Sequence, residues 1–515
     1  MSSRTSSTHS PAACGAADLL RAVLTIRREV AHEADAIFHA WQSHITRSEF
    51  VSGARNLAHY LALRRHDLGE LQDQLACWGV SSLGRSESRV LLNLDAAAAT
   101  LAAIAGAELP ANIQRPSYEE YARGARALTA QKLALFGPDP DGPKSRIMVT
   151  LPAEAASNPQ LCIDLISHGA DCARINCAHD SPDVWLAMAA NMREAAAARR
   201  RPCPVLMDLG GPKLRIERVL SEAPVCLKTG DRFMLLADER HRSEFPAVVF
   251  SEPRALDDLR VGESVWIDDG KIGSVVERID TAGALLRVTA TRDKGHVLKA
   301  LKGLNFPDTQ IDLPALTAKD RVDLDFVVEH ADMIGYSFVQ RPKDVALLQR
   351  ELELRGKPSM PIVLKIETRL ALDNLPRLIV TAAGRQPTAV MLARGDLAVE
   401  LGFGRLAEIQ EEILWMCEAA QVPTIWATQV LERLVKKGQP VRAETTDAAM
   451  SQRAECVMLN KGPHLVEGVR FLDDVLRRMD RHQTKKTSRL TPLRSWQGSQ
   501  ALDIETSRRD ATDPA

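Results

Sequence analysis

Eight short apolar runs, each typical of a buried β-strand, recur between residues 147 and 460. Their starts lie about 25–34 residues apart, with one exception, and helical segments fill the intervals. This spacing is typical of strand–helix units in a parallel sheet. The runs are IMVTL (147–151), CARIN (172–176), PVLMDL (204–209), MIGYSF (333–338), IVLKIE (362–367), AVMLARGD (389–396), PTIWAT (423–428) and CVMLN (456–460).

Eight such units match the count of a closed (β/α)₈ TIM barrel. A doubly wound open sheet is the competing architecture, but it does not call for eight units. The sequence therefore predicts an α/β fold built on a (β/α)₈ barrel.

The one long interval, from residue 204 to residue 333, predicts an insertion after the third strand. Within it, stretches such as ESVWIDDGKIGSVVERI alternate apolar and polar residues and carry Asp-Gly turns. We therefore expect a small inserted β-barrel lid domain at 216–309. The catalytic barrel would then comprise 145–215 and 310–482.

The regions outside the barrel differ from it in composition and in the spacing of their apolar residues. Residues 16–136 carry apolar residues at three- and four-residue spacing, which predicts an N-terminal helical domain. The segment FGPDPDGPKS (136–145) is a linker rich in proline and glycine. Residues 1–15 and 483–515 are polar without hydrophobic periodicity, so we expect both to be disordered tails.

Bulk composition excludes several classes of protein. The formal net charge is −1, so neither nucleic acid nor an anionic membrane is expected as a partner. The nine cysteines are scattered without a Cys-x-x-Cys pair, which indicates a reducing compartment rather than a disulfide framework or zinc site. No apolar run is long enough to span a membrane and the first residues lack a signal core, so we expect a cytoplasmic protein.

Charged and polar residues gather at the predicted C-terminal ends of the strands, where barrel enzymes place their chemistry. Taken singly, each has a structural explanation: a Lys-x-Glu pair is more often an edge charge pair, and an aspartate after glycine is more often a helix N-cap. Together they place carboxylates, arginines and a lysine on one rim, which packing alone explains poorly. They are Arg174, Asn176, Asp208, Lys213, Arg215, Lys365, Glu367, Arg394, Gly395, Asp396 and Thr428.

The chemistry of this set suggests phosphoryl transfer. Glu367 and Asp396 come from adjacent strands and suit a hard divalent cation such as Mg²⁺. Lys365 and the nearby arginines suit a phosphate and an oxyanion that develops during reaction. No residue of the set needs to be a nucleophile, which is the pattern of direct phosphoryl transfer.

These motifs resemble those of the pyruvate kinase family. The barrel motifs are CARINCAH, LMDLGGPKLR, LKIET, MLARGDLAVELG, IWATQVLERL and GQPVRAETTDAA, and WIDDGKI and LKGLNFP resemble signatures of the family's inserted domain. The resemblance covers about residues 145–480, with all eight motifs in order.

The resemblance implies a glycolytic reaction in which phosphoenolpyruvate phosphorylates ADP to give pyruvate and ATP. It implies Mg²⁺, with Mn²⁺ as a substitute, and a homo-oligomer formed through the barrel. The implied catalytic residues are Lys365, Arg174, Arg215 and Thr428, and the metal ligands are Glu367 and Asp396. Substrate would also contact Gly395, and the nucleotide would contact Asn176, His179, Arg215 and Lys302.

Some positions depart from the family pattern. Ala178 stands where a serine usually ligates K⁺, Leu209 replaces a threonine, and Lys213 replaces a glutamate that accompanies K⁺ dependence. We therefore expect the Lys213 ammonium to substitute for K⁺. Gln340 replaces an arginine and LNKGPHLVEG replaces the usual loop after the last strand. We also expect no counterpart of the family's C-terminal domain, and nothing in the sequence assigns a role to the helical domain.

Two other functions fit part of these observations. One is a Mg²⁺-dependent lyase that binds phosphoenolpyruvate or pyruvate, although a lyase needs no nucleotide lid. The other is a catalytically degenerate paralogue with a sensing or scaffold role, against which the retained Lys365, Glu367, Asp396 and Thr428 argue.

Overall fold

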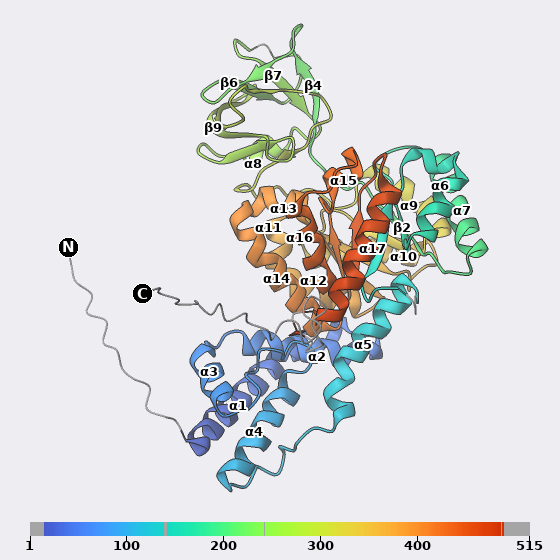
Figure 1. Cartoon of the computed structure of the whole chain (residues 1–515). Helices are drawn as coiled ribbons and strands as arrows, with labels where there is room; N and C mark the ends of the chain where they lie inside the picture. The colour runs from blue at the N-terminus through green and yellow to red at the C-terminus, as the bar shows by residue number, and fades with distance from the viewer. Residues whose placement is uncertain (1–14, 139–141, 242, 486, 489–515) are drawn as a thin grey trace, which may run out of the picture.

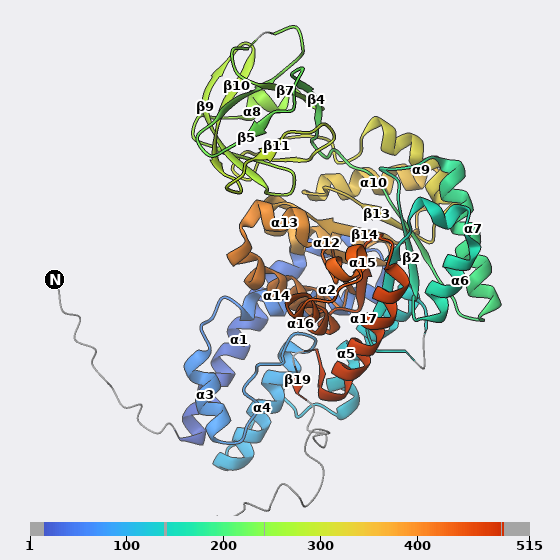
Figure 2. The ribbon, with the colours of Figure 1, turned by 45° about the horizontal axis from the view of Figure 1, so that its top comes forward.

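The computed structural model describes residues 15–138, 142–241, 243–485 and 487–488. Within these residues a helical region and a β-rich region lie at opposite ends of a central barrel (Figure 1). A second view, with the top turned forward, shows the same order (Figure 2). No helix among the described residues is both long enough and apolar enough to cross a membrane.

The central barrel confirms the predicted fold. Eight parallel strands close on themselves in the order β1-β17-β16-β15-β14-β13-β3-β2. Every one of them is buried or nearly so, as expected for strands covered by helices on the outside and by one another within. The strands are β1 (Arg146–Thr150), β2 (Cys172–Asn176), β3 (Val205–Asp208), β13 (Met333–Tyr336), β14 (Ile362–Ile366), β15 (Thr388–Ala393), β16 (Thr424–Ala427) and β17 (Cys456–Leu459).

Helices follow the strands in alternation and surround the barrel. Some begin with recognisable caps; Asn158, for example, accepts the backbone N–H of Leu161 at 3.2 Å and is followed by a proline. They are α6 (Pro159–Ser167), α7 (Pro182–Ala198), α9 (Ala318–His330), α10 (Pro342–Leu354), α11 (Arg369–Asp373), α12 (Leu375–Ala383), α13 (Arg394–Leu401), α14 (Phe403–Ala420), α15 (Glu432–Lys437), α16 (Arg442–Met450) and α17 (Leu465–His482).

The inserted region after β3 is a seven-stranded sheet in the order β12-β8-β9-β10-β6-β7-β4, with a separate β5–β11 pair. It has its own apolar core, in which Phe233 is fully buried. Its elements are β4 (Ile216–Leu220), β5 (Cys226–Leu227), β6 (Arg232–Leu236), β7 (Ala247–Phe250), α8 (Ala255–Asp258), β8 (Ser264–Ile267), β9 (Ile272–Asp280), β10 (Gly283–Ala290), β11 (His296–Val297) and β12 (Leu304–Asn305).

This sheet forms the small inserted β domain that the sequence predicted, and it curls toward a barrel. Among the described residues its two edges meet at one end, through a bridge between Arg215 and Gly303 and adjacent backbone hydrogen bonds. The edge strand β12 is two residues long, so it cannot pair with β4 along the whole edge. The sheet therefore curls toward a barrel without closing along its length.

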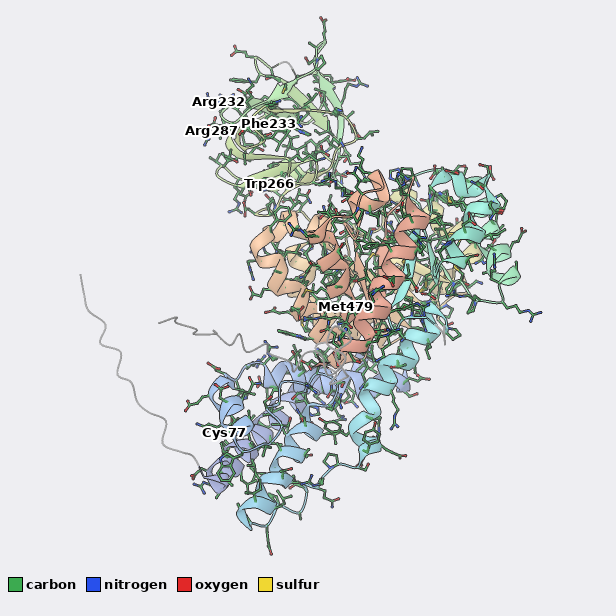
Figure 3. All side chains as sticks on the ribbon, in the orientation of Figure 1. Cys77, Arg232, Phe233, Trp266, Arg287 and Met479 are labelled. Carbon is green, nitrogen blue, oxygen red and sulfur yellow. The ribbon has the colours of Figure 1, made fainter. Side chains whose placement is uncertain are left out.

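On the outer surface of this sheet, Arg232 and Arg287 lie near each other on adjacent strands (Figure 3). Directly opposed like charges destabilise a strand pair. Glu277 on β9 offsets this, because its Oε2 lies 2.6 Å from Arg232 Nε and its Oε1 lies 2.6 Å from Arg287 Nε.

Five α-helices precede the barrel in the described part of the chain, as the apolar spacing predicted. The last of them, α5, begins with a capping box in which Ser117 and Glu120 bind each other's backbone N–H at 3.2 and 2.9 Å. The helices are α1 (Ala16–Trp41), α2 (Ser48–Leu63), α3 (Gly69–Cys77), α4 (Val90–Ala105) and α5 (Tyr118–Phe136).

The helical region packs closely on the N-terminal face of the barrel. Asn56 on α2 donates a hydrogen bond to the carbonyl of Ala419 at 2.8 Å. A Cβ added to Gly53 would lie 2.3 Å from the carbonyl oxygen of Ala420, so α2 needs a glycine at this approach. At the end of α5, Leu135 and Phe136 join the apolar cluster that fills the barrel interior. The two regions therefore share one packed core.

The expected tails fall mostly outside the described residues: 1–14, 486 and 489–515 are not described. For residues 483–485 the expectation of disorder is wrong. A short ribbon pairs β18 (Gln483–Thr484) with β19 (Thr487–Ser488), and the Lys485 ammonium lies 2.5 Å from the buried Glu455. This buried charge pair, which periodicity does not reveal, orders the segment.

Candidate active site

The candidate site lies at the C-terminal ends of the barrel strands, on the side where the inserted domain joins the barrel. Lys365, near the end of β14, stands at its centre with only 8% of its surface exposed. Its ammonium lies 3.1 Å from Asp208 Oδ2 and 3.3 Å from Glu367 Oε1, and it donates to the Ser337 hydroxyl at 2.5 Å. Burial disfavours the ammonium, but Asp208 and then Glu367 outweigh it and raise the pKa of Lys365. The lysine is therefore a fixed positive charge.

Glu367 directly follows β14 and is 4% exposed. One carboxylate oxygen accepts the backbone N–H of Phe338 at 2.6 Å. Burial raises the pKa of Glu367, and Asp396 raises it further, whereas Lys365 lowers it. The influence of Asp396 on this pKa places the two carboxylates near each other.

Asp396 lies in the first turn of α13, directly after β15, which is the neighbour of β14 in the barrel. Its Oδ1 lies 2.7 Å from the Lys213 ammonium. Lys213 comes from the loop after β3, so the structure brings together two residues that are 183 positions apart. The sequence placed Lys213 near Asn176 and Asp208 as a substitute for K⁺, whereas the structure pairs it with the predicted metal ligand.

Arg174 on β2 binds the buried carboxylate of Asp208 at the end of β3. Its Nε donates to Asp208 Oδ2 at 3.0 Å, Nη2 binds the same oxygen, and Nη1 donates to the Thr150 hydroxyl at 3.1 Å. Burial opposes ionisation of Asp208, but Lys365 and Arg174 hold its pKa below the usual value. Asp208 thus fixes the two cations side by side.

Glycine is required where β13 passes this cluster. A Cβ on Gly335 would lie 2.4 Å from Asp208 Oδ1. The missing side chain therefore makes room for the carboxylate that orients Lys365 and Arg174.

Thr428, directly after β16, has a φ of 63°, which is strained for a β-branched residue. Its hydroxyl oxygen accepts the backbone N–H of Gly395 at 2.8 Å, so its proton is directed elsewhere. Arg394 holds the strained turn by donating to the carbonyls of Ala427 and Thr428 at 3.0 and 2.6 Å. Its guanidinium also pairs with Asp447, at 2.5 Å. We conclude that Arg394 is a positioning residue for the turn that carries Thr428.

The four residues expected to contact nucleotide fall into two groups. Asn176 and His179 lie at the end of β2 and in the turn that follows. Arg215 and Lys302 lie on the inserted domain, where Arg215 Nη1 donates to the Leu301 carbonyl at 3.0 Å. Lys302 lies 2.9 Å from Asp268 Oδ1, so this ammonium is held by a carboxylate in the described conformation.

Two residues of the site were missed by the sequence analysis. Ser337 follows β13 and bridges Lys365 to the Leu209 carbonyl, to which it donates at 2.7 Å. Lys461 comes shortly after β17 and lies near His179. Burial lowers the pKa of His179 most, and the positive charge of Lys461 is the next largest cause. Ser337 lies near the end of the predicted strand 333–338 and Lys461 directly follows the predicted strand 456–460, so the position rule that found Arg174 also applies to them.

The described residues contain no group of three or more His, Cys, Asp or Glu side chains that would hold a metal ion. The predicted metal site needs only two carboxylates, with the remaining coordination positions left to substrate and water. Glu367 and Asp396 fit this demand, because both are oxygen donors that follow adjacent strands. In the described conformation Lys213 pairs with Asp396, so this ammonium would have to share the carboxylate with the metal or leave it.

Similarity to known proteins extends over the barrel that carries this rim. The family model described as pyruvate kinase, barrel domain, matches residues 142–463. The chain belongs to the pyruvate kinase family. Human pyruvate kinase PKLR is 31% identical over 66% of this chain, and pyruvate kinase of Geobacillus stearothermophilus is 30% identical over 65%. Pyruvate kinase of Methylorubrum extorquens is 31% identical over 66% of the chain.

The matched part spans about 60% of the human relative's length and 57% of the Geobacillus relative's length. The family-model match, residues 142–463, includes all eight barrel strands and the inserted domain.

Proposed function

We propose that this chain catalyses the pyruvate kinase reaction, the transfer of the phosphoryl group of phosphoenolpyruvate to ADP. The observation that carries the proposal is the buried Lys365, held 3.1 Å from Asp208 and 3.3 Å from Glu367 beside Arg174. In the reaction the bond between phosphorus and the enol oxygen breaks, and a bond forms from the terminal oxygen of ADP. The enolate then takes a proton at its methylene carbon to give pyruvate.

Glu367 and Asp396 would hold Mg²⁺, or Mn²⁺ in its place, which supplies positive charge to the phosphate and enolate oxygens. The chain's own cations would share that task. Lys365 would contact the transferring phosphoryl group and the enol oxygen, and Arg174 would bind the substrate phosphate. Because Asp208 holds both cations in place, little reorganisation would accompany the transfer of charge.

Thr428 and Gly395 would complete the substrate site. The Thr428 hydroxyl oxygen is already engaged by the Gly395 N–H, so its proton is available to order the path of proton delivery to the enolate. The strain at Thr428 supports a functional role, because such backbone conformations persist where the surrounding structure imposes them.

The nucleotide phosphates would lie between the barrel and the inserted domain. His179, Asn176 and Lys461 would approach from the barrel, and Arg215 and Lys302 from the inserted domain. Lys302 would exchange Asp268 for a phosphate oxygen as the inserted domain closes. Closure would also exclude water from the transferring group.

We further propose that K⁺ is not required. Ala178 offers no side-chain oxygen, and the Lys213 ammonium at 2.7 Å from Asp396 already supplies a positive charge at the metal site. Cytoplasmic location and a homo-oligomer formed through the barrel remain predictions.

The test is an assay for ATP and pyruvate formed from ADP and phosphoenolpyruvate, with and without Mg²⁺. Turnover that requires all three components supports the proposal. Consumption of phosphoenolpyruvate without ADP would favour the lyase, and binding without turnover would favour the degenerate paralogue. Lys365→Arg keeps the charge that the buried carboxylates need but moves it, so a loss of about 10²-fold or more is expected. The exposed Lys357→Arg is the matched control.

A further inference from the structure

A cavity of about 400 Å³ lies between the helical region and the N-terminal face of the barrel. One wall is formed by Ser145 and Glu455, which directly precede β1 and β17. The other wall is formed by α5 and the segment 85–89 before α4. Since the candidate active site lies at the carboxyl ends of the same strands, the cavity is at the opposite end of the barrel.

The carboxylates that face this cavity already have protein partners. Glu455 accepts the backbone N–H and the hydroxyl of Thr424 at 2.9 Å each, and it lies 2.5 Å from the Lys485 ammonium. Asp480 accepts a backbone N–H at 2.6 Å. The other carboxylates of the lining are also engaged, namely Glu87 and Glu418. The carboxylates of the cavity wall are therefore already bound by other groups of the protein.

Three cations of the same lining lack a carboxylate partner. Arg89 Nε donates to a serine hydroxyl at 3.2 Å, and its guanidinium lies 4.4 Å from the centre of the Tyr121 ring. Lys132 Nζ donates to a backbone carbonyl at 2.9 Å, and Arg85 projects from the 85–89 segment. In the part of the chain that the structure describes, none of the three forms an ion pair with a carboxylate. Their direct contacts are with a hydroxyl, a backbone carbonyl and an aromatic ring.

The pKa of Lys132 shows that its positive charge is disfavoured at this position. Burial lowers the pKa of Lys132, and repulsion by Arg146 lowers it further, although Glu455 and Asp480 raise it. An anion in the cavity would relieve both effects. The empty space beside these cations is therefore favourable for negative charge.

We propose that this cavity binds the phosphate group of a small molecule through Arg85, Arg89 and Lys132. Two guanidinium groups and an ammonium match the charge and the several acceptor oxygens of a phosphate dianion better than those of a single carboxylate. The rest of the lining includes Leu128 and Thr129, so a small organic portion has both apolar and polar surface to contact. The volume lies within the range of small-molecule sites.

The ligand would touch both regions of the chain at once. It would connect α5 and the segment 85–89 to residues at the start of β1 and to the segment after α17. Because the site exists only when these regions are docked, binding would raise the unfolding temperature of the whole chain.

The test is isothermal titration of the full chain with inorganic phosphate and, separately, with glycerol 3-phosphate. We expect a saturable component whose dissociation constant rises about tenfold or more in Lys132→Met and in Arg89→Gln. Lys357→Met is the control, since Lys357 is an exposed lysine that also lies at the N-terminal end of a barrel strand. It should leave that component unchanged. Phosphate bound at the active site would persist in all variants and so would not be mistaken for this component.

Tighter binding of glycerol 3-phosphate would identify an organic phosphate as the ligand, and equal binding would identify free phosphate; both support the proposal. Absence of a component sensitive to these variants, up to about 10 mM ligand, would overturn it. If Lys132→Met itself lowers the unfolding temperature, the same titration is made with Arg85→Gln, because Arg85 is exposed and its replacement should not disturb the fold. No turnover is measured, so a failed kinase assay and a failed phosphate titration remain distinguishable.

Discussion

At the scale of single residues, the site depends on buried charges that stabilise one another. Lys365 and Arg174 share Asp208, and Lys365 also lies 3.3 Å from Glu367. Removing one partner of such a network leaves a buried charge uncompensated, and this is costly. Glu367 differs from Asp208, because burial raises its pKa whereas the two cations lower that of Asp208.

In Glu367→Gln, Asp208 still balances Lys365 and the glutamine oxygen can still accept the Phe338 N–H, so the fold should stay intact. The substitution should also remove one of the two proposed metal ligands, and turnover should fall by about 10²–10³-fold. The measurements are steady-state turnover and Mn²⁺ binding followed by electron paramagnetic resonance. Unchanged Mn²⁺ affinity would show that Glu367 is not a ligand.

The pairing of Lys213 with Asp396 predicts full activity without K⁺. Two unit charges 4 Å apart repel by about 4 kcal/mol at an effective dielectric of 20, which is enough to disfavour a second monovalent cation nearby. The measurement is turnover in Mg²⁺ with tetramethylammonium replacing K⁺ at constant ionic strength. A several-fold loss of rate would refute the prediction. Lys213→Glu combined with Ala178→Ser should create a K⁺ requirement.

At the scale of secondary-structure elements, short helices at the strand ends place the site residues. The helix α13 carries Asp396 in its first turn and Glu400 one turn later, where Glu400 is 9% exposed. Burial raises the pKa of Glu400 to about 7, although the Arg369 backbone N–H and the Asn305 side chain oppose this. Asn305 belongs to β12, so α13 contacts the inserted domain through a carboxyl group that titrates near neutrality.

The pKa of Glu400 predicts a pH-dependent stability. Between its unfolded value of 4.5 and about 7, the folded state binds more protons than the unfolded state. The free energy of unfolding should therefore fall as pH rises through this window, by about 3 kcal/mol in total. Glu400→Gln should abolish this loss and be more stable than the parent at pH 8, but not at pH 4.5.

The measurement is denaturant unfolding at both pH values, with the exposed Glu408→Gln as the control. An equal stability difference between Glu400→Gln and the parent at pH 4.5 and pH 8 would contradict the assignment.

At the scale of the whole molecule, the barrel separates two docked regions. The inserted domain joins at the carboxyl ends of the strands, and the helical region covers the amino ends (Figure 1). The end of α5 contributes Leu135 and Phe136 to the barrel interior, so the helical region is part of the barrel core.

This arrangement predicts that truncating the end of α5 destabilises the barrel itself. Phe136 is fully buried, so Phe136→Ala should lower the free energy of unfolding by about 3–5 kcal/mol. The control is Phe403→Ala, because Phe403 is 70% exposed and should change stability little. The measurement is denaturant unfolding followed by circular dichroism. Similar effects of the two substitutions would mean that α5 does not close the barrel core.

The sequence by itself determined the eight-unit barrel, the helical region and most of the rim. Strand–helix alternation is a local periodic pattern, and parallel strands bring their carboxyl ends to one edge whatever the details of packing. Arg174, Lys365, Glu367 and Asp396 were therefore predictable from their positions after apolar runs.

Only the tertiary structure decided which side chains meet. Lys213 pairs with Asp396, Lys302 with Asp268, and Lys485 with Glu455. These contacts join separate segments, and their geometry depends on how loops and domains pack, which no local periodicity encodes. The same holds for the incomplete closure of the inserted sheet and for the basic cavity beneath the barrel. Each depends on the distance between elements that are remote in the chain.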